Sequence, residues 1–214
     1  HQRLRDEPRL VAAAEAKQLK LFDVRDPAAD LPIGNGKPRA GRRLLTVGTD
    51  CAVGKMYSTL AIERELRRRG VAADFRATGQ TGILIAGSGV PIDAVIADFI
   101  AGAAEWLSPE RHDGGWDLIE GQGSLFHPSY AGVSLGLLHG AQARALVLCH
   151  EAGRETIRHA GDYPVPALAE CLARNLEAAR LTSPDVIAVG IAVNTSALPA
   201  QEAQAYCRRV EDEL

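Results

Sequence analysis

A glycine-rich stretch in the N-terminal part of this 214-residue chain combines the residue types that bind phosphate. An apolar run over 44–47 precedes it, and a helical pattern over 59–69 follows it. In such a strand–loop–helix unit, the loop N–H groups and the positive end of the helix dipole converge on phosphate oxygens, and a Lys adds a cation. We therefore predict a phosphate-binding loop made of Gly48, Thr49, Asp50, Cys51, Ala52, Val53, Gly54, Lys55, Met56 and Tyr57.

Two departures from the P-loop of nucleoside triphosphatases limit what this loop is expected to do. Met56 stands where that motif has Ser or Thr, whose hydroxyl binds Mg²⁺. The first glycine, Gly48, also lies one position early for the strict spacing. Ser58 or Thr59 could supply a hydroxyl only from a different angle of the helix. A glycine-rich turn without a ligand is the alternative, which the strand before it and the helix after it disfavour.

The elements around this loop alternate in type, which predicts an α/β fold: a three-layer parallel sheet of the P-loop NTPase kind. In such a sheet, ligands bind outside the carboxyl ends of the strands. The expected strands cover 43–47, 72–76, 116–120, 145–150 and 185–194, and the expected helices cover 55–69, 91–106, 167–181 and 199–213. We expect a second polar turn at 78–82 and a long loop over 121–136.

The N-terminal region has a different pattern. A helix is expected over 6–20 and a short strand over 20–25, followed by a Pro- and Gly-rich linker over 26–43. The chain opens at His1 with helical material. We therefore expect residues 1–40 to be the remnant of a preceding Rossmann-like domain and its linker, and residues 41–214 to form the P-loop α/β domain.

Composition excludes several functional classes. A hydrophobic content of 46% allows a sizeable core, and a net charge of −3 provides no basic footprint for nucleic acid. No run of about 18 apolar residues could span a membrane, and no signal peptide is visible. The four cysteines form no CxxC pair, which favours a reducing compartment over a disulfide framework or zinc site. We expect a cytoplasmic homo-oligomer that acts on a small molecule.

Several motifs carry a resemblance to known families. The loop 48–55, the Glu-Gly segment 119–123 and the late strand 190–194 resemble dethiobiotin synthetase and its P-loop relatives, in the same order. More closely, the segments 47–56, 77–82, 98–106, 120–128 and 148–154 resemble a family catalogued as a domain of unknown function. Its members are described as D-glutamate N-acetyltransferases that use acetyl-CoA, with a Rossmann-like domain before the P-loop domain. Met56 belongs to that family pattern.

This resemblance implies acetyl transfer from acetyl-CoA to the amino group of an acidic amino acid, D-glutamate above all. Coenzyme A carries a 3′-phosphate, a diphosphate and an adenine, so a P-loop can hold it without hydrolysing anything, and no metal is needed. The resemblance further implies that Asn194 reads the adenine, although an Asn after a strand can also be a simple turn cap.

Two alternatives remain open at this point. In an ATP-dependent ligase or kinase of the dethiobiotin synthetase type, Asp50 and Glu120 would hold Mg²⁺. In a regulatory module, the loop would bind a nucleotide without turnover.

Acetylation of an amine requires a base, because only the neutral amine is nucleophilic. Glu120, at the end of an apolar strand, and His127 are the first candidates, and Asp98 is the third. The Ser124 hydroxyl or N–H groups over 121–124 could stabilise the oxyanion. The structural alternative is that Glu120 caps backbone groups and His127 shapes the loop.

An acidic acceptor also requires a cation. Arg154 could bind its carboxylate in a bidentate way, with Arg76 a weaker choice. Cys149 is disfavoured as an acyl-carrying nucleophile, because its neighbour His150 points to the opposite face of the strand. The residues predicted to bind the acceptor are Thr78, Gly79, Gln80, Thr81, Gly82, Gln122, His150 and Arg154.

Overall fold

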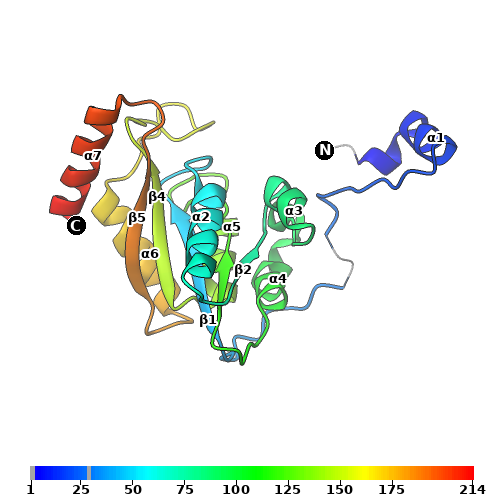
Figure 1. Cartoon of the computed structure of the whole chain (residues 1–214), viewed down its shortest axis with the longest axis horizontal. Coiled ribbons are helices and arrows are strands. Elements are labelled where there is room, and N and C mark those ends of the chain that lie inside the picture. Colours follow the sequence, from blue (N-terminus) through cyan, green and yellow to red (C-terminus); the bar gives the residue numbers. More distant parts are fainter. Residues whose placement is uncertain (1–2, 28–29) are drawn as a thin grey trace.

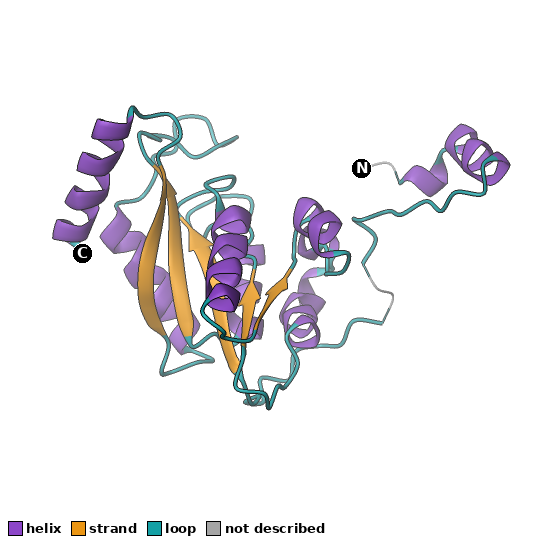
Figure 2. Ribbon diagram, in the orientation of Figure 1, coloured by secondary structure: helices purple, strands orange, loops and turns teal. Residues whose placement is uncertain are grey.

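The computed structural model describes residues 3–27 and 30–214. Its centre is a parallel sheet with the strand order β2-β3-β1-β4-β5 (Figures 1 and 2). The strands are β1 (Arg42–Gly48), β2 (Ala73–Arg76), β3 (Trp116–Ile119), β4 (Ala145–Glu151) and β5 (Ile187–Asn194). The predicted α/β class and parallel sheet are confirmed.

Strands β1 and β4 are largely apolar, as expected for strands of a parallel sheet that are covered on both faces. Helix α2 (Lys55–Arg68) covers one face, and packs Ile62 and Leu66 against Leu44 and Val147. The other face packs against α4 (Ile100–Leu107), α5 (Ala131–Ala141) and α6 (Leu168–Arg180). The three layers predicted from the alternating pattern are therefore present (Figure 2). Helix α7 (Ala200–Glu213) follows β5.

The single helix predicted over 91–106 is wrong. Two short 3-10 helices, η2 (Ile92–Ala94) and η3 (Ala97–Phe99), precede α4, and the backbone is extended at Val95 and Ile96. Both residues are β-branched, which lowers helix propensity. Trp106 is 54% exposed, so the expected apolar face does not continue to the end of the segment.

Two helices lie where turns and loops were expected. Helix α3 (Gln80–Ala86) occupies much of the predicted turn at 78–82, and α5 begins inside the predicted loop 121–136. The glycines of α5 weaken its helix signal. Gly136 and Gly140 have a packing reason, however, because a Cβ at Gly136 would overlap the Ile100 side chain and one at Gly140 would overlap the backbone of Ala101. Close contact with α4 thus requires residues that sequence patterns treat as helix breakers.

The N-terminal segment forms η1 (Leu4–Asp6) and α1 (Pro8–Ala16), which lie apart from the sheet in Figure 1. The strand predicted over 20–25 is wrong, because this stretch joins no ladder among the described residues. Asp23 instead accepts hydrogen bonds from the N–H groups of Leu4 and Arg5. That residues 1–40 are the tail of a Rossmann-like domain stays a prediction. No helix of the described ranges has the length and apolar character needed to cross a bilayer.

Candidate active site

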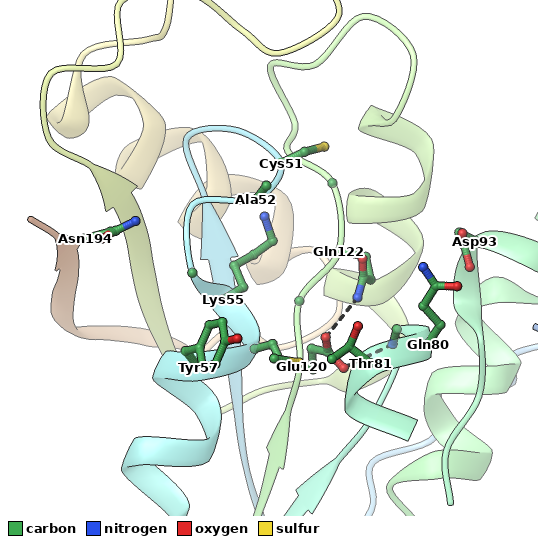
Figure 3. A pocket seen from close by; sticks show the side chains of 15 residues that line it. Cys51, Ala52, Lys55, Tyr57, Gln80, Thr81, Asp93, Glu120, Gln122 and Asn194 are labelled. Atoms are coloured by element: carbon green, nitrogen blue, oxygen red, sulfur yellow. Dashed lines mark hydrogen bonds between the residues drawn. The ribbon is translucent and has the colours of Figure 1, made fainter. Parts of the chain in front are cut away.

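A cavity of about 480 Å³ lies at the carboxyl edge of the sheet (Figure 3). We call it the main cavity, because the predicted motifs meet there. It is formed where the loop after β1, the loop after β3, the start of α3 and the end of β5 meet. Its walls are Cys51, Ala52, Gly54, Lys55, Met56, Tyr57, Gly79, Gln80, Thr81, Asp93, Glu120, Gly121, Gln122, Gly123 and Asn194. Motifs from distant parts of the sequence thus face one space, as expected for ligands of a parallel sheet.

The loop between β1 and α2 has the backbone of a phosphate cradle. Gly54 has a φ of 102° and Ala52 a φ of 54°, both in the left-handed region that occurs in anion-binding nests of successive N–H groups. The Nζ of Lys55 donates to the carbonyl oxygen of Asp50 at 2.7 Å. Burial lowers the pKa of Lys55 below its ordinary value, with nearby thiols and Asp50 opposing the shift. A phosphate would restore the charge partner that this amine lacks.

The Asp50 carboxylate stabilises the phosphate-binding loop through hydrogen bonds. Its Oδ1 accepts from the N–H of Cys51 at 2.6 Å, and its Oδ2 accepts from the Arg158 N–H at 2.8 Å. Arg154 completes the arrangement with a bond from Nη1 to Asp50 Oδ2 at 2.7 Å and a second bond to the Cys51 carbonyl oxygen. The Asp50 carboxylate is fully buried, so this charge-assisted network stabilises the loop conformation.

Glu120 is a buried carboxylate on the cavity wall, only 4% exposed. Its Oε2 accepts from the N–H groups of Thr78 and Gly79 at 2.9 and 3.1 Å, and its Oε1 accepts from Gln122 Nε2 at 3.2 Å. Burial raises the pKa of Glu120 above its ordinary value, against the lowering effect of those N–H bonds. A carboxylate in this state is a stronger base than an exposed one.

The opposite end of the cavity is formed by Tyr57 and Asn194. Tyr57 is 72% exposed on the first turn of α2, and Figure 3 shows Asn194 facing the cavity from the end of β5. Asn194 Oδ1 accepts from the N–H of Ser196 at 3.1 Å, so the carbonyl end of this amide is a turn cap. The side chain therefore combines the capping role with a place on the cavity wall.

A family model described as "Domain of unknown function (DUF1611_C) P-loop domain" matches residues 32–214. The chain belongs to this family. A DUF1611 family protein from Anabaena variabilis, solved by crystallography, superposes with a TM-score of 0.85 at 37% identity, over 96% of this chain and 61% of that one. The resemblance inferred from the motifs and the predicted P-loop fold are both confirmed.

Two curated relatives carry the name D-glutamate N-acetyltransferase. One, from Tritonibacter scottomollicae, is 54% identical over 214 residues, which are 100% of this chain and 64% of the relative. The other, from a Pseudoalteromonas species, is 50% identical over 98% of this chain and 63% of the relative. The DUF1611 chain described here thus spans slightly less than two thirds of the length of these relatives.

Several residues predicted for catalysis do not line the cavity of this DUF1611 domain. His127 is buried; its Nδ1 accepts from the Ser129 N–H and its Nε2 bonds the Arg158 carbonyl oxygen, so both nitrogens are engaged. The Ser124 hydroxyl donates to the Thr49 carbonyl oxygen and accepts from an N–H. Asp98 lies in η3, away from the cavity walls. Among the three base candidates, only Glu120 lies on the wall.

His150 and Arg154, predicted to bind substrate, face a different cavity of about 610 Å³ between β4 and α7. His150 Nδ1 is 3.0 Å from the Thr49 hydroxyl, and its Nε2 is 2.8 Å from the Tyr206 hydroxyl. Arg154 is committed to Asp50 and also pairs with Glu151. His150 and Arg154 therefore stabilise the phosphate-binding loop through contacts that lie outside the main cavity. The predicted acceptor residues that do line the main cavity are Gly79, Gln80, Thr81 and Gln122.

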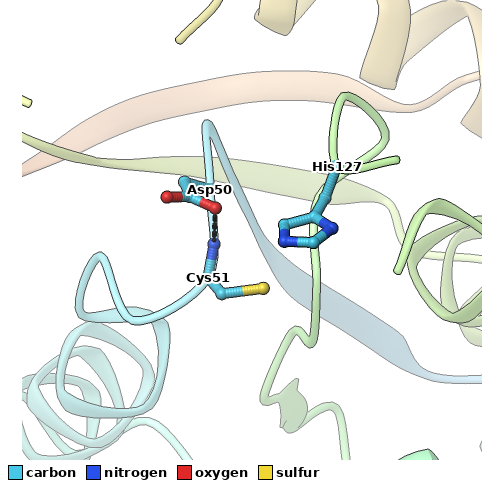
Figure 4. Close-up of side chains that lie close together, drawn as sticks. All are labelled: Asp50, Cys51 and His127. Atoms are coloured by element: carbon cyan, nitrogen blue, oxygen red, sulfur yellow. Dashed lines mark hydrogen bonds between the residues drawn. The ribbon is translucent and has the colours of Figure 1, made fainter. Parts of the chain in front are cut away.

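Asp50, Cys51 and His127 bring three possible metal-ligand atoms within 4.8 Å of one another (Figure 4). The donors do not fit a metal centre, because both Asp50 oxygens and both His127 nitrogens already have hydrogen-bond partners. Arg154 also places a positive charge against Asp50, which opposes cation binding. We assign no metal to this cluster.

Sequence reasoning missed two residues beside the main cavity. Asp93 lies on the wall, and Arg25 from the N-terminal segment pairs with it. The two are 68 positions apart in the sequence and neither belongs to a recognisable motif, so only the folded chain reveals them.

Proposed function

We propose that this domain binds acetyl-CoA and takes part in transferring its acetyl group to the amino group of an acidic amino acid, with D-glutamate the first choice. The observation that supports this most is a phosphate-binding loop and a buried carboxylate, Glu120, on one cavity wall. The names of the two curated relatives favour the same activity.

The loop suits coenzyme A better than a hydrolysable triphosphate. The loop N–H groups and Lys55 can bind phosphate oxygens, but Met56, on the cavity wall, offers no hydroxyl to Mg²⁺. The carboxylates that would replace it, Asp50 and Glu120, are both engaged with N–H donors. Phosphates of coenzyme A need only to be held, and Tyr57 and Asn194 at the far end leave a place for the adenine.

Glu120 is the proposed general base. The acceptor arrives as an ammonium ion, and Glu120 removes a proton so that the nitrogen lone pair can attack the thioester carbonyl. Acetyl-CoA supplies an acetyl group activated as a thioester. The proposed oxyanion donors are N–H groups of the loop 122–124, because the Gly121 N–H already donates to the Thr46 hydroxyl. As the tetrahedral intermediate collapses, the carbon–sulfur bond breaks and Glu120 returns its proton to the leaving thiolate. The second proton of the former ammonium nitrogen passes to solvent.

The proposal is tested by incubating the whole protein with acetyl-CoA and D-glutamate while free thiol is measured. We expect thiol release that depends on the acceptor and is lost in Lys55→Ala and Glu120→Gln. The absence of thiol above background with D- and L-glutamate and D- and L-aspartate would overturn it.

The ligase or kinase alternative is tested by calorimetric titration of the same protein with coenzyme A and with ATP-Mg²⁺. We expect coenzyme A to bind more tightly. Tighter binding of ATP-Mg²⁺ would instead favour the ATP-dependent reaction. Either ligand at about 100 times its Kd should stabilise the fold by roughly 2.7 kcal/mol, which is measurable by thermal unfolding.

A further inference from the structure

The charges of the main cavity are unbalanced for an acidic acceptor. Among the described residues on its walls, Lys55 is the only basic side chain, whereas Asp93 and Glu120 are acidic. Lys55 lies inside the phosphate loop, bonded to the Asp50 carbonyl oxygen. A dicarboxylate that approached Glu120 would therefore meet carboxylates without a cation to bind its own.

A cation is paired with one of these wall carboxylates, although it is not a wall residue itself. Arg25 forms an ion pair with Asp93, which Figure 3 shows on the same side of the cavity as Gln80. The side chains of Arg25 and Asp93 are 27% and 44% exposed, so the pair is partly in water. Ion pairs in such surroundings contribute little stability, so a ligand carboxylate can compete for the guanidinium. A guanidinium can bind a carboxylate with two parallel hydrogen bonds, which gives it an advantage over Lys in this role.

The segment that carries Arg25 is ordered around its own charges. Asp23 accepts from the N–H groups of Leu4 and Arg5, and the Arg5 guanidinium pairs with both Asp23 and Asp26. These contacts fold the stretch 3–26 back on itself. A hollow of about 280 Å³ separates this segment from the residues 83–91 that follow the first turn of α3. Arg25 is thus held beside the wall residue Asp93 by a segment that precedes the residues 32–214 matched by the family model.

We propose that Arg25 binds a carboxylate of the acidic acceptor, and that Asp93 holds its guanidinium at the rim until the acceptor takes its place. This inference rests on the proposed function and adds the residue that selects an acidic substrate. It assigns acceptor recognition in part to the N-terminal segment, and leaves Lys55 for the phosphates of the donor.

The test compares Arg25→Ala, Arg25→Lys and the matched control Arg9→Ala in the whole protein. Arg9 belongs to the same N-terminal segment and is exposed, and its guanidinium forms no ion pair with the described residues. We expect Arg25→Ala to raise the KM for D-glutamate by about 10- to 100-fold, the range for one hydrogen-bonded charge, with the KM for acetyl-CoA changed by less than about twofold. Arg25→Lys should give an intermediate KM, and Arg9→Ala should leave both values within about twofold of the original protein.

Three outcomes separate the possibilities. If the unmodified protein releases no thiol with any acidic amino acid, the proposed function fails. If it is active and Arg25→Ala leaves the KM for D-glutamate unchanged, the assignment of Arg25 alone fails. If Arg9→Ala raises this KM as much as Arg25→Ala, the effect is not specific to Arg25 and the assignment is overturned. Thermal unfolding of each variant, with and without D-glutamate in the presence of coenzyme A, measures acceptor binding independently of turnover. The acceptor should raise the midpoint of the control but not that of Arg25→Ala.

Discussion

Gly82 lies so close to Glu120 that a Cβ on Gly82 would overlap Glu120 Oε2 and would stand 3.1 Å from the carboxyl carbon. The first turn of α3 therefore closes over this carboxylate, and only glycine permits the approach. The same turn supplies Gly79, whose N–H bonds Oε2. The position of the proposed base thus depends on a helix that is far from it in the sequence.

Gly82→Ala is expected to displace the Glu120 carboxylate and to reduce kcat by about tenfold or more, because a misplaced base loses much of the 10²- to 10⁴-fold that general base catalysis contributes. Coenzyme A binding should change little. The measurement is steady-state thiol release together with a coenzyme A titration.

Gly132→Ala is the control for this substitution, because Gly132 is also helical and its added Cβ meets no atom within 4 Å. It should leave activity unchanged. An unaffected kcat in Gly82→Ala would show that the precise position of Glu120 is not required.

Glu120→Gln is expected to abolish activity and yet to raise stability at neutral pH. The folded protein raises the pKa of this carboxyl above the ordinary 4.5, so ionisation favours the unfolded chain at pH values above the folded pKa. Glutamine removes this cost. Thermal midpoints of the two proteins, compared between pH 4 and pH 8, should differ at the upper end and converge as the pH falls below about 4.5.

The activity of the unmodified protein should also follow the Glu120 carboxyl. Because the base must be ionised, kcat/KM should fall as the pH drops through its raised pKa, on the alkaline side of the ordinary 4.5. The measurement is a pH profile of thiol release from pH 4.5 to 8.5. An acid limb centred at or below the ordinary value would contradict the role of burial.

Lys55→Met is expected to weaken coenzyme A binding by about 10- to 100-fold, since one charge-assisted bond to phosphate is lost while the side-chain volume is kept. The exposed Lys37 provides a matched control, and Lys37→Met should bind as before. Calorimetric titration gives the Kd of each variant for coenzyme A. Equal values for the two variants would show that Lys55 does not bind the phosphates.

Arg154→Ala is expected to destabilise the fold by about 3 kcal/mol, because it leaves the Asp50 carboxylate buried without its charge partner. The P-loop should loosen at the same time and coenzyme A should bind less tightly. Denaturant unfolding of Arg154→Ala, Asp50→Asn and the double variant measures the coupling. If the effects of the two single variants simply add, the pair does not act as a unit.

The main elements could be predicted from sequence because local patterns determine them. The apolar runs of β1 and β4, the Gly54-Lys55 pair before α2 and the amphipathic α6 and α7 each lie within one contiguous stretch. Where packing between distant elements decides the conformation, the predictions were wrong. Gly136 favours a loop in the sequence pattern, because the reason for this glycine, its contact with Ile100 of α4, is not visible along the chain.

The candidate site divides in the same way. The sequence by itself determined the phosphate loop, the carboxylate after β3 and the Asn after β5, because in a parallel sheet such residues must share the carboxyl edge. Only the tertiary structure decided which polar side chains line the cavity and which stabilise its loops through contacts outside the cavity. His127 and Arg154 have the chemistry of site residues, but their polar atoms are engaged by the loops 50–51 and 151–158. Arg25 and Asp93 are 68 positions apart and meet only because the chain folds back on itself. No local sequence pattern can predict a contact over that separation.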